Sequence, residues 1–211
     1  MKKLLFFLFG LLLISLNSFS QEVEKENIKK CYETYKKSLL NNDGKQAYAC
    51  LDKKTRKYYD ELLDKIKTYD SIQIEKESIV NKLSILTIRH RVPKDEILKM
   101  NGEGLFIYSI DYGFVDKGSV QHYELGTIEF RRKIAKAQMM SGNLPSFYKY
   151  LFYKQKNQWY INLTSLHPMS NYALKKMIEE LQQTEDDFIL YSLASITRRN
   201  LDNSIWHPLV K

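Results

Sequence analysis

Apolar side chains recur every three or four residues from Glu22 to Leu40, a spacing that places them along one face of a helix. This stripe consists of Ile28, Cys31, Tyr32, Tyr35 and Leu39. The turn NNDG at 41–44 ends the helix, because Asn and Gly readily take the positive φ of a helix terminus. A short helix at 47–51 and a longer one beginning near Asp52, whose side chain can cap it, are predicted next.

The middle of the chain, about 79–113, is predicted to form three further helices. The stretch SIVNKLSILTIRHR has apolar residues at helical spacing, although its Ile and Thr content would also suit a strand. Pro93 opens a second helix, which Asn101 and Gly102 end. The third helix, EGLFIYSIDYG, is expected to stop at Gly113.

β-Branched and aromatic residues then dominate 119–166, in the runs SVQHYELGTIEF, KIAKAQMM, SFYKYLFYK and QWYINLTSL. The short connections between the runs predict an antiparallel meander. Side chains alternate between the two faces of a strand, so the pattern also predicts which residues face the core. These are Trp159, Ile161 and Leu163, with Ala135, Ala137, Met139, Tyr148, Tyr150 and Phe152 on the neighbouring runs.

Helical spacing returns after His167, with one apolar stripe formed by Tyr172, Leu174, Met177, Ile178 and Leu181, and another at 188–196. Helices, then strands, then helices predict an α+β fold. We expect a curved antiparallel sheet of three to four strands packed on N-terminal helices, with a helical insert at about 79–113 and a C-terminal helical extension at about 167–211. No repeat or linker interrupts 21–211, which predicts a single domain.

The order of these elements resembles the NTF2-like superfamily, in which a curved sheet wraps a long N-terminal helix to form a cone. The closing strand of that family commonly reads Trp-x-Ile-Asp-Leu, and the strand before it carries a pattern such as Ala-x-Ala. The corresponding stretches here are WYINL at 159–163 and AKA at 135–137, and the resemblance covers about 22–166. Asn162 replaces the usual Asp, so a role that depends on a charge at this position does not carry over.

The first twenty residues, MKKLLFFLFGLLLISLNSFS, have the layout of a secretory signal peptide cleaved after Ser20. Lys2 and Lys3 precede an apolar run, and small residues stand just before the cleavage point. The run from Leu4 to Ile14 is too short to cross a hydrocarbon layer, which needs about 20 residues. We therefore expect an exported protein, periplasmic or secreted, with no membrane anchor after signal removal.

The formal net charge of +8 does not by itself indicate a nucleic-acid partner, because the basic residues are spread along the chain. The densest groups, at 89–91 and 131–133, are short. We expect a solvated surface and no nucleic acid. The partner is expected to be a small apolar ligand or another protein.

Cys31 and Cys50 are the only cysteines, and in an oxidising compartment an even pair is a possible disulfide. Counted outward from the turn at 41–44, however, the two positions are out of register by about one helical turn, which disfavours bridging. The alternative is two small buried side chains that do not meet.

The aromatic residues on the inner face have two explanations that the sequence leaves open. Either they form a filled core in which each tyrosine hydroxyl has a partner, or they line a cone pocket that receives a ligand. The candidate binding residues for such a pocket are Tyr32, Tyr35, Tyr148, Tyr150 and Trp159.

The sequence contains no recognisable catalytic set, metal-binding spacing or cofactor motif, so we expect no catalytic residues, metal or cofactor. Our first interpretation is a non-catalytic exported binding domain. The first alternative is a small-molecule isomerase or cyclase with a buried carboxylate, for which Asp111, Glu124 and Glu129 are candidates and Tyr148 a proton donor. The second is an exported immunity protein that neutralises a toxin through its surface.

Overall fold

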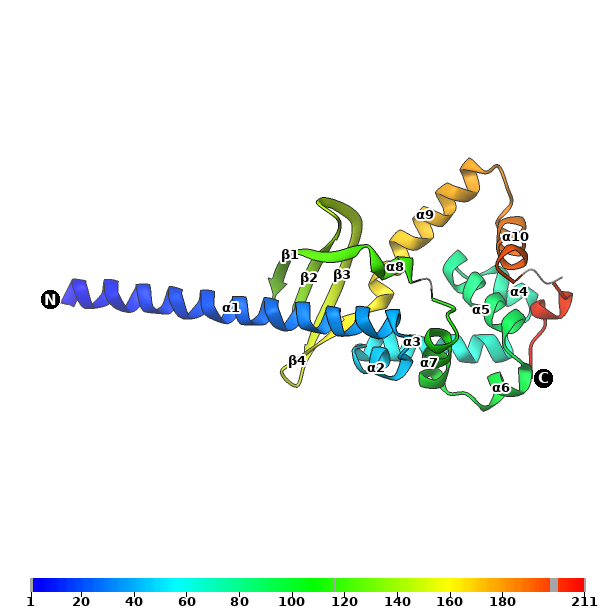
Figure 1. Ribbon diagram of the computed structural model, residues 1–211, viewed down its shortest axis with the longest axis horizontal. Helices are drawn as coiled ribbons and strands as arrows, with labels where there is room; N and C mark the ends of the chain where they lie inside the picture. The colour runs from blue at the N-terminus through cyan, green and yellow to red at the C-terminus, as the bar shows by residue number, and fades with distance from the viewer. Residues whose placement is uncertain (1, 116, 198–200, 211) are drawn as a thin grey trace.

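The computed structural model describes residues 2–115, 117–197 and 201–210, with side chains from residue 21 on except at 119, 196 and 197. The chain has the predicted α+β architecture, with a four-stranded antiparallel sheet packed on helices (Figure 1). The predicted signal peptide at 1–20 lies outside the residues whose side chains are described, so its cleavage stays a prediction.

Before the sheet, the described helices are α1 (Lys2–Leu40), α2 (Gly44–Ala49), α3 (Lys53–Thr68), α4 (Ser71–Glu75), α5 (Ile79–Arg91), α6 (Lys94–Lys99), α7 (Gly102–Asp111) and α8 (Gly118–Gln121). The strands are β1 (Tyr123–Arg131), β2 (Ile134–Ser141), β3 (Leu144–Gln155) and β4 (Gln158–Asn162). The 3-10 turn η1 (Leu163–Leu166), the helices α9 (His167–Glu180) and α10 (Glu185–Thr197), and the 3-10 turn η2 (Asn203–Trp206) follow.

The strands pair in the order β1-β2-β3-β4, as a meander predicts. The register shifts twice, between Leu125 and Ile128 on β1 and between Gln138 and Met140 on β2, and such irregularities bend a sheet. The inner face is the predicted one, since the buried residues on the last three strands include Ala135, Ala137, Met139, Tyr150, Phe152, Trp159 and Ile161.

Two boundaries of the predicted strands are wrong. The first run was expected to be extended from 119, but 118–121 form α8, which places Val120 in the core beside the sheet. The last run was expected to reach Leu166, but β4 ends at Asn162. The Asn162 side chain accepts a hydrogen bond from the Ser165 amide at 2.8 Å, which turns the backbone into η1.

Asn162 also ties the sheet to the helices. Its Nδ2 donates to Asp52 Oδ2 at 2.8 Å, and both side chains are buried. The other oxygen of Asp52 accepts from the Thr55 amide at 2.8 Å and so caps α3, as predicted. Beside this pair, Leu51 and Ile161 form a parallel bridge that joins the backbones of the two segments. One buried amide–carboxylate contact thus connects the start of α3 to the end of β4.

The core consists of two clusters of buried residues. The first lies between α1 and the sheet and includes Tyr32, Tyr35 and Phe152. The second lies among α3, α5, α7 and the C-terminal helices (Figure 1). The ring of Tyr59 packs against both clusters, so it stands at their boundary.

The predicted apolar stripe of α9 is only partly buried. Ile178 is buried, whereas Tyr172, Met177 and Leu181 are exposed. The helix contacts α5, η1 and α10 along one narrow side, which leaves the rest of the stripe open to solvent. Helical spacing alone marks an apolar face but cannot say how much of that face a neighbour covers.

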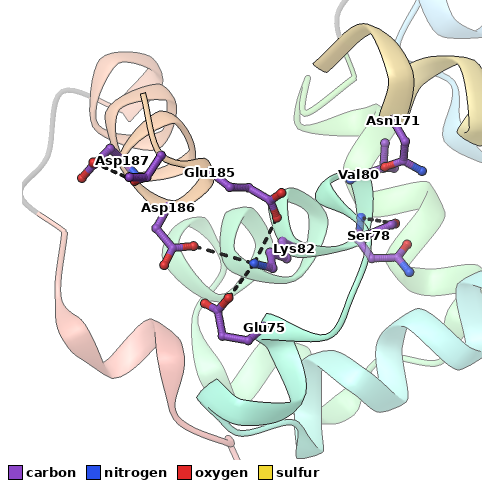
Figure 2. Close-up of polar contacts among 10 residues, drawn as sticks. Glu75, Ser78, Val80, Lys82, Asn171, Glu185, Asp186 and Asp187 are labelled. Atoms are coloured by element: carbon purple, nitrogen blue, oxygen red, sulfur yellow. Dashed lines mark hydrogen bonds and ion pairs between the residues drawn. The ribbon is translucent and has the colours of Figure 1, made fainter. Parts of the chain in front are cut away.

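Two polar contacts fasten the C-terminal helices to α5 (Figure 2). Asn171 Oδ1 on α9 accepts from the Val80 amide at 3.0 Å. Lys82, whose side chain is only 4% exposed, reaches Glu75 at 2.7 Å and Glu185, at the start of α10, at 3.0 Å. Burial alone would lower the pKa of Lys82, but the hydrogen bonds with the two glutamates outweigh it and raise the pKa. Lys82 is therefore a buried cation that holds α4, α5 and α10 together.

The buried contact between Asn162 and Asp52 predicts the effect of an acidic substitution. In Asn162→Asp the two carboxylates would face each other, so we expect the free energy of unfolding at pH 7 to fall by about 2 kcal/mol or more. This deficit should shrink as the pH falls toward about 4, because one carboxyl then takes a proton and can donate to the other. Urea denaturation at both pH values measures it.

The matched control is Asn157→Asp on the exposed β3–β4 turn, which we expect to change the free energy of unfolding by less than about 0.5 kcal/mol. Equal effects of the two substitutions, or a deficit in Asn162→Asp that does not depend on pH, would contradict the assigned role of the contact.

The Lys82 cluster predicts a second difference in stability. Lys82→Met leaves Glu75, Glu185 and Asp186 without their cation, and we expect a loss of about 1–2 kcal/mol, limited by the partial exposure of the three carboxylates. The control is Lys57→Met, because Lys57 is 77% exposed and pairs only with Glu61 on the same helix. That change should cost less than about 0.5 kcal/mol. Urea denaturation measures the free energy of unfolding of both variants. A similar loss in each would show that the burial of Lys82 adds nothing to the stability of the protein.

Candidate functional site

A hollow of about 530 Å³ lies between the inner face of the sheet and the surrounding helices, and we call it the main chamber. Its walls come from α1, α3, α7, α8, the first three strands, η1 and the start of α9. The lining residues are Tyr35, Tyr59, Phe106, Val115, Gly118, Val120, Tyr123, Met139, Tyr148, Tyr150, Leu163, Leu166, His167 and Ser170. The volume is within the range of small-molecule sites in proteins.

Three of the five candidate binding residues line this chamber. Tyr35 comes from α1, and Tyr148 and Tyr150 come from one face of β3, where their alternate positions put both rings on the same side. Tyr35 and Tyr150 are buried, and Tyr148 is half-buried. Burial raises the pKa of both Tyr35 and Tyr150, so their hydroxyls stay neutral at physiological pH.

Tyr32 and Trp159 have structural contacts instead. The Tyr32 ring packs behind Tyr150 at 5.5 Å between ring centroids, and its hydroxyl donates to the Tyr123 carbonyl at 3.1 Å. Trp159 is buried, and its indole N–H donates to Glu24 Oε2 at 2.6 Å. Neither residue is among those that line the main chamber. Both explanations of the inner face therefore apply, each to a different part of it. Tyr32 and Trp159 belong to a filled core, and Tyr35, Tyr148 and Tyr150 line a hollow.

His167 is the titratable side chain of the main chamber other than the tyrosines. Burial, followed by the nearby charge of Lys54, lowers its pKa, so the imidazole is neutral near pH 7. Its ring meets the Tyr58 ring edge-on at 4.7 Å. The sequence showed only an isolated histidine, and no local pattern marked it as a residue that faces a hollow. The structure places it at the start of α9, one 3-10 turn after β4 ends.

The remaining lining residues were not among the candidates. Phe106, Tyr59 and Val115 belong to the helical part of the chain, and Phe106 meets Tyr59 edge-on at 4.9 Å. Their apolar character predicted burial, but the local pattern contains nothing that separates a side chain facing a hollow from one facing another side chain.

The three candidate carboxylates of the enzyme alternative lie outside the main chamber. Asp111 Oδ1 accepts from the Gly44 amide at 2.7 Å and so joins α7 to α2. A side chain at Gly44 would collide with α7, because a Cβ there would lie 2.6 Å from the Ile107 carbonyl oxygen. Glu124 and Glu129 are exposed on β1. The structure does not bring Asp111 and Tyr148 together at one site.

Cys31 and Cys50 line a surface hollow of about 360 Å³ between α1, α2 and the β3–β4 turn, which we call the thiol cleft. The Cys31 thiol donates to the Trp159 carbonyl at 3.2 Å, and the Cys50 thiol donates to the Gln46 carbonyl at 3.5 Å. Interaction with the neighbouring thiol lowers the pKa of Cys50 and, together with burial, raises that of Cys31. Both cysteines are free in the structure. Counting residues from the turn disfavoured such a meeting, but Cys50 lies just beyond the short α2 rather than on a long antiparallel helix.

Among the described residues, no group of three or more His, Cys, Asp or Glu side chains is arranged to hold a metal ion. Within the same residues, no helix has both the length and the apolar character that crossing a membrane requires. Comparisons of the chain with protein-family models, with curated proteins and with solved structures find no match.

The thiol cleft predicts that oxidation joins Cys31 to Cys50. Treatment with oxidised glutathione should remove both free thiols from the Ellman titration and lower the protein mass by two hydrogens. For a loop of this length the bond should raise the free energy of unfolding by about 3 kcal/mol. Cys50→Ser is the control, because its stability should not rise with oxidant. Two thiols that stay reactive after treatment would show that the side chains cannot reach bonding geometry.

Proposed function

We propose that the protein is an exported, non-catalytic domain that binds a small, largely apolar ligand in the main chamber. The observation that carries the proposal is the hollow of about 530 Å³ with an aromatic and aliphatic lining. Binding sites for small molecules combine such a lining with a few placed polar groups. In this chamber those groups are the hydroxyls of Tyr35, Tyr148 and Tyr150 and the imidazole of His167.

The character of the lining favours binding over the isomerase or cyclase alternative. Among the residues that the structure describes, none that lines the main chamber is Asp, Glu, Lys or Arg. The enzyme alternative requires a carboxylate of raised pKa next to the ligand, and its candidates are bonded to backbone or exposed elsewhere. An immunity protein acts through its outer surface and has no use for a hollow interior, so the chamber also favours a small ligand over a toxin.

Export and family membership belong to the same proposal. The signal-like layout of 1–20 supports a periplasmic or secreted location. The long α1 packed against a bent meander, with Trp159 turned toward the core, supports the resemblance to the NTF2-like superfamily. A cone-shaped interior is what that resemblance leads us to expect.

The test uses N-phenyl-1-naphthylamine, an uncharged apolar dye whose fluorescence rises when it leaves water. We expect the purified protein to bind it saturably, and Leu163→Trp to weaken binding by about tenfold, or about 1.4 kcal/mol, because the indole fills part of the main chamber. Fluorescence titration measures the dissociation constants, and circular dichroism checks that each variant is folded.

Leu144→Trp is the matched control, since Leu144 is 73% exposed at the start of β3 and is not among the residues that line the main chamber. Its affinity for the dye should equal that of the unchanged protein. Absence of saturable binding, or equal affinities in Leu163→Trp and Leu144→Trp, would refute the proposed function.

A further inference from the structure

A second hollow, which we call the side chamber, lies between α3 and the helical insert and has a volume of about 280 Å³. It is lined by α3, α5, α7, the segment that follows α7 and the start of α9. The lining residues are Tyr58, Tyr59, Leu62, Val80, Leu83, Ser84, Thr87, Ile88, Leu105, Ser109, Phe114, Val115 and His167. This chamber belongs to the second core cluster, whereas the main chamber belongs to the first.

Three side chains line both chambers, namely Tyr59, Val115 and His167. Tyr59 is braced on both sides, by the Phe106 ring at 4.9 Å and by the Tyr58 ring at 5.4 Å. Tyr58 in turn meets His167 at 4.7 Å. The two hollows therefore adjoin at these three side chains.

The side chamber offers mainly apolar surface to a ligand. Its lining contains no Asp, Glu, Lys or Arg. The Ser84 and Ser109 hydroxyls donate to carbonyls of their own helices, both at 2.8 Å. The Tyr58 hydroxyl donates to Asn81 Oδ1 at 2.9 Å. Three of the polar side chains that line this hollow are thus already bonded, which suits a tail without hydrogen-bonding groups.

The main chamber suits the opposite end of such a ligand. The hydroxyls of Tyr35, Tyr148 and Tyr150 can hydrogen-bond a polar head, and among the described lining residues no side chain carries a charge that could pair with a charged head. A thin, flexible chain passes between closely packed side chains more readily than a fused ring system.

We propose that the ligand is an amphiphile with an uncharged polar head and an unbranched alkyl or acyl chain that spans both chambers. The head lies among the tyrosines of the main chamber, and the tail passes Tyr59, Val115 and His167 into the side chamber. This inference rests on the proposed function, since it names the class of ligand that the main chamber receives.

The test compares straight-chain alcohols from 1-hexanol to 1-dodecanol by displacement of N-phenyl-1-naphthylamine from the purified protein. In the unchanged protein, each methylene buried should raise affinity by about fourfold. In Thr87→Trp the indole occupies the side chamber, so the gain in affinity with chain length should end at a shorter alcohol than in the unchanged protein. We expect 1-dodecanol to lose affinity by about tenfold or more, and 1-hexanol to stay within about twofold. Dodecanoate should bind more weakly than 1-dodecanol, because its carboxylate has no partner.

Thr68→Trp is the matched control, since Thr68 is exposed at the end of α3, and its affinities should follow the unchanged protein. Ser84→Phe, which fills the same chamber from the next turn of α5, replaces Thr87→Trp if that variant does not fold. If short alcohols bind but longer ones gain nothing, or the filling variant weakens all lengths equally, this inference is overturned and the proposed function stands. If neither the dye nor any alcohol binds, both this inference and the proposed function are refuted.

Discussion

The hydrogen bond from Asn162 to Asp52 is the contact on which the arrangement of the whole molecule depends. It joins two helix-initiating side chains, one that caps α3 and one that starts η1, and it does so in the core. The neighbouring bridge between Leu51 and Ile161 extends the sheet onto the helical segment. Because η1 leads directly into His167, this junction also positions the part of the main chamber that is lined by η1 and the start of α9.

The junction explains why an amide suits position 162. Asp52 already supplies the acceptor, and an amide is the side chain that can donate to it while its oxygen accepts from the Ser165 amide. Two carboxylates at this distance would repel each other away from water.

The two chambers arise from the way in which the two core clusters meet. The first cluster is built on a sheet and the second on helices, and their surfaces do not interlock fully along the boundary. Tyr59 stands there, edge-on to both Phe106 and Tyr58. Both hollows border Tyr59, so they lie along the boundary between the clusters. Lys82 stabilises the outer side of the second cluster by holding α10 on α5.

The sequence by itself determined the order of helices and strands, the inner face of the sheet and the cap at Asp52. These features follow from periodicity, strand alternation and short-range hydrogen bonding, all of which act between residues close together in the chain. The pattern correctly placed Tyr35, Tyr148 and Tyr150 among the residues that line the main chamber. It also predicted Tyr32 and Trp159 as lining residues, and these two lie outside it. Only the tertiary structure decided that Trp159 reaches Glu24, that Cys31 meets Cys50, and that His167 faces a hollow. The reason is physical: a cavity is the space that elements distant in sequence fail to fill, and its size depends on their spacing and not on the pattern within any one of them.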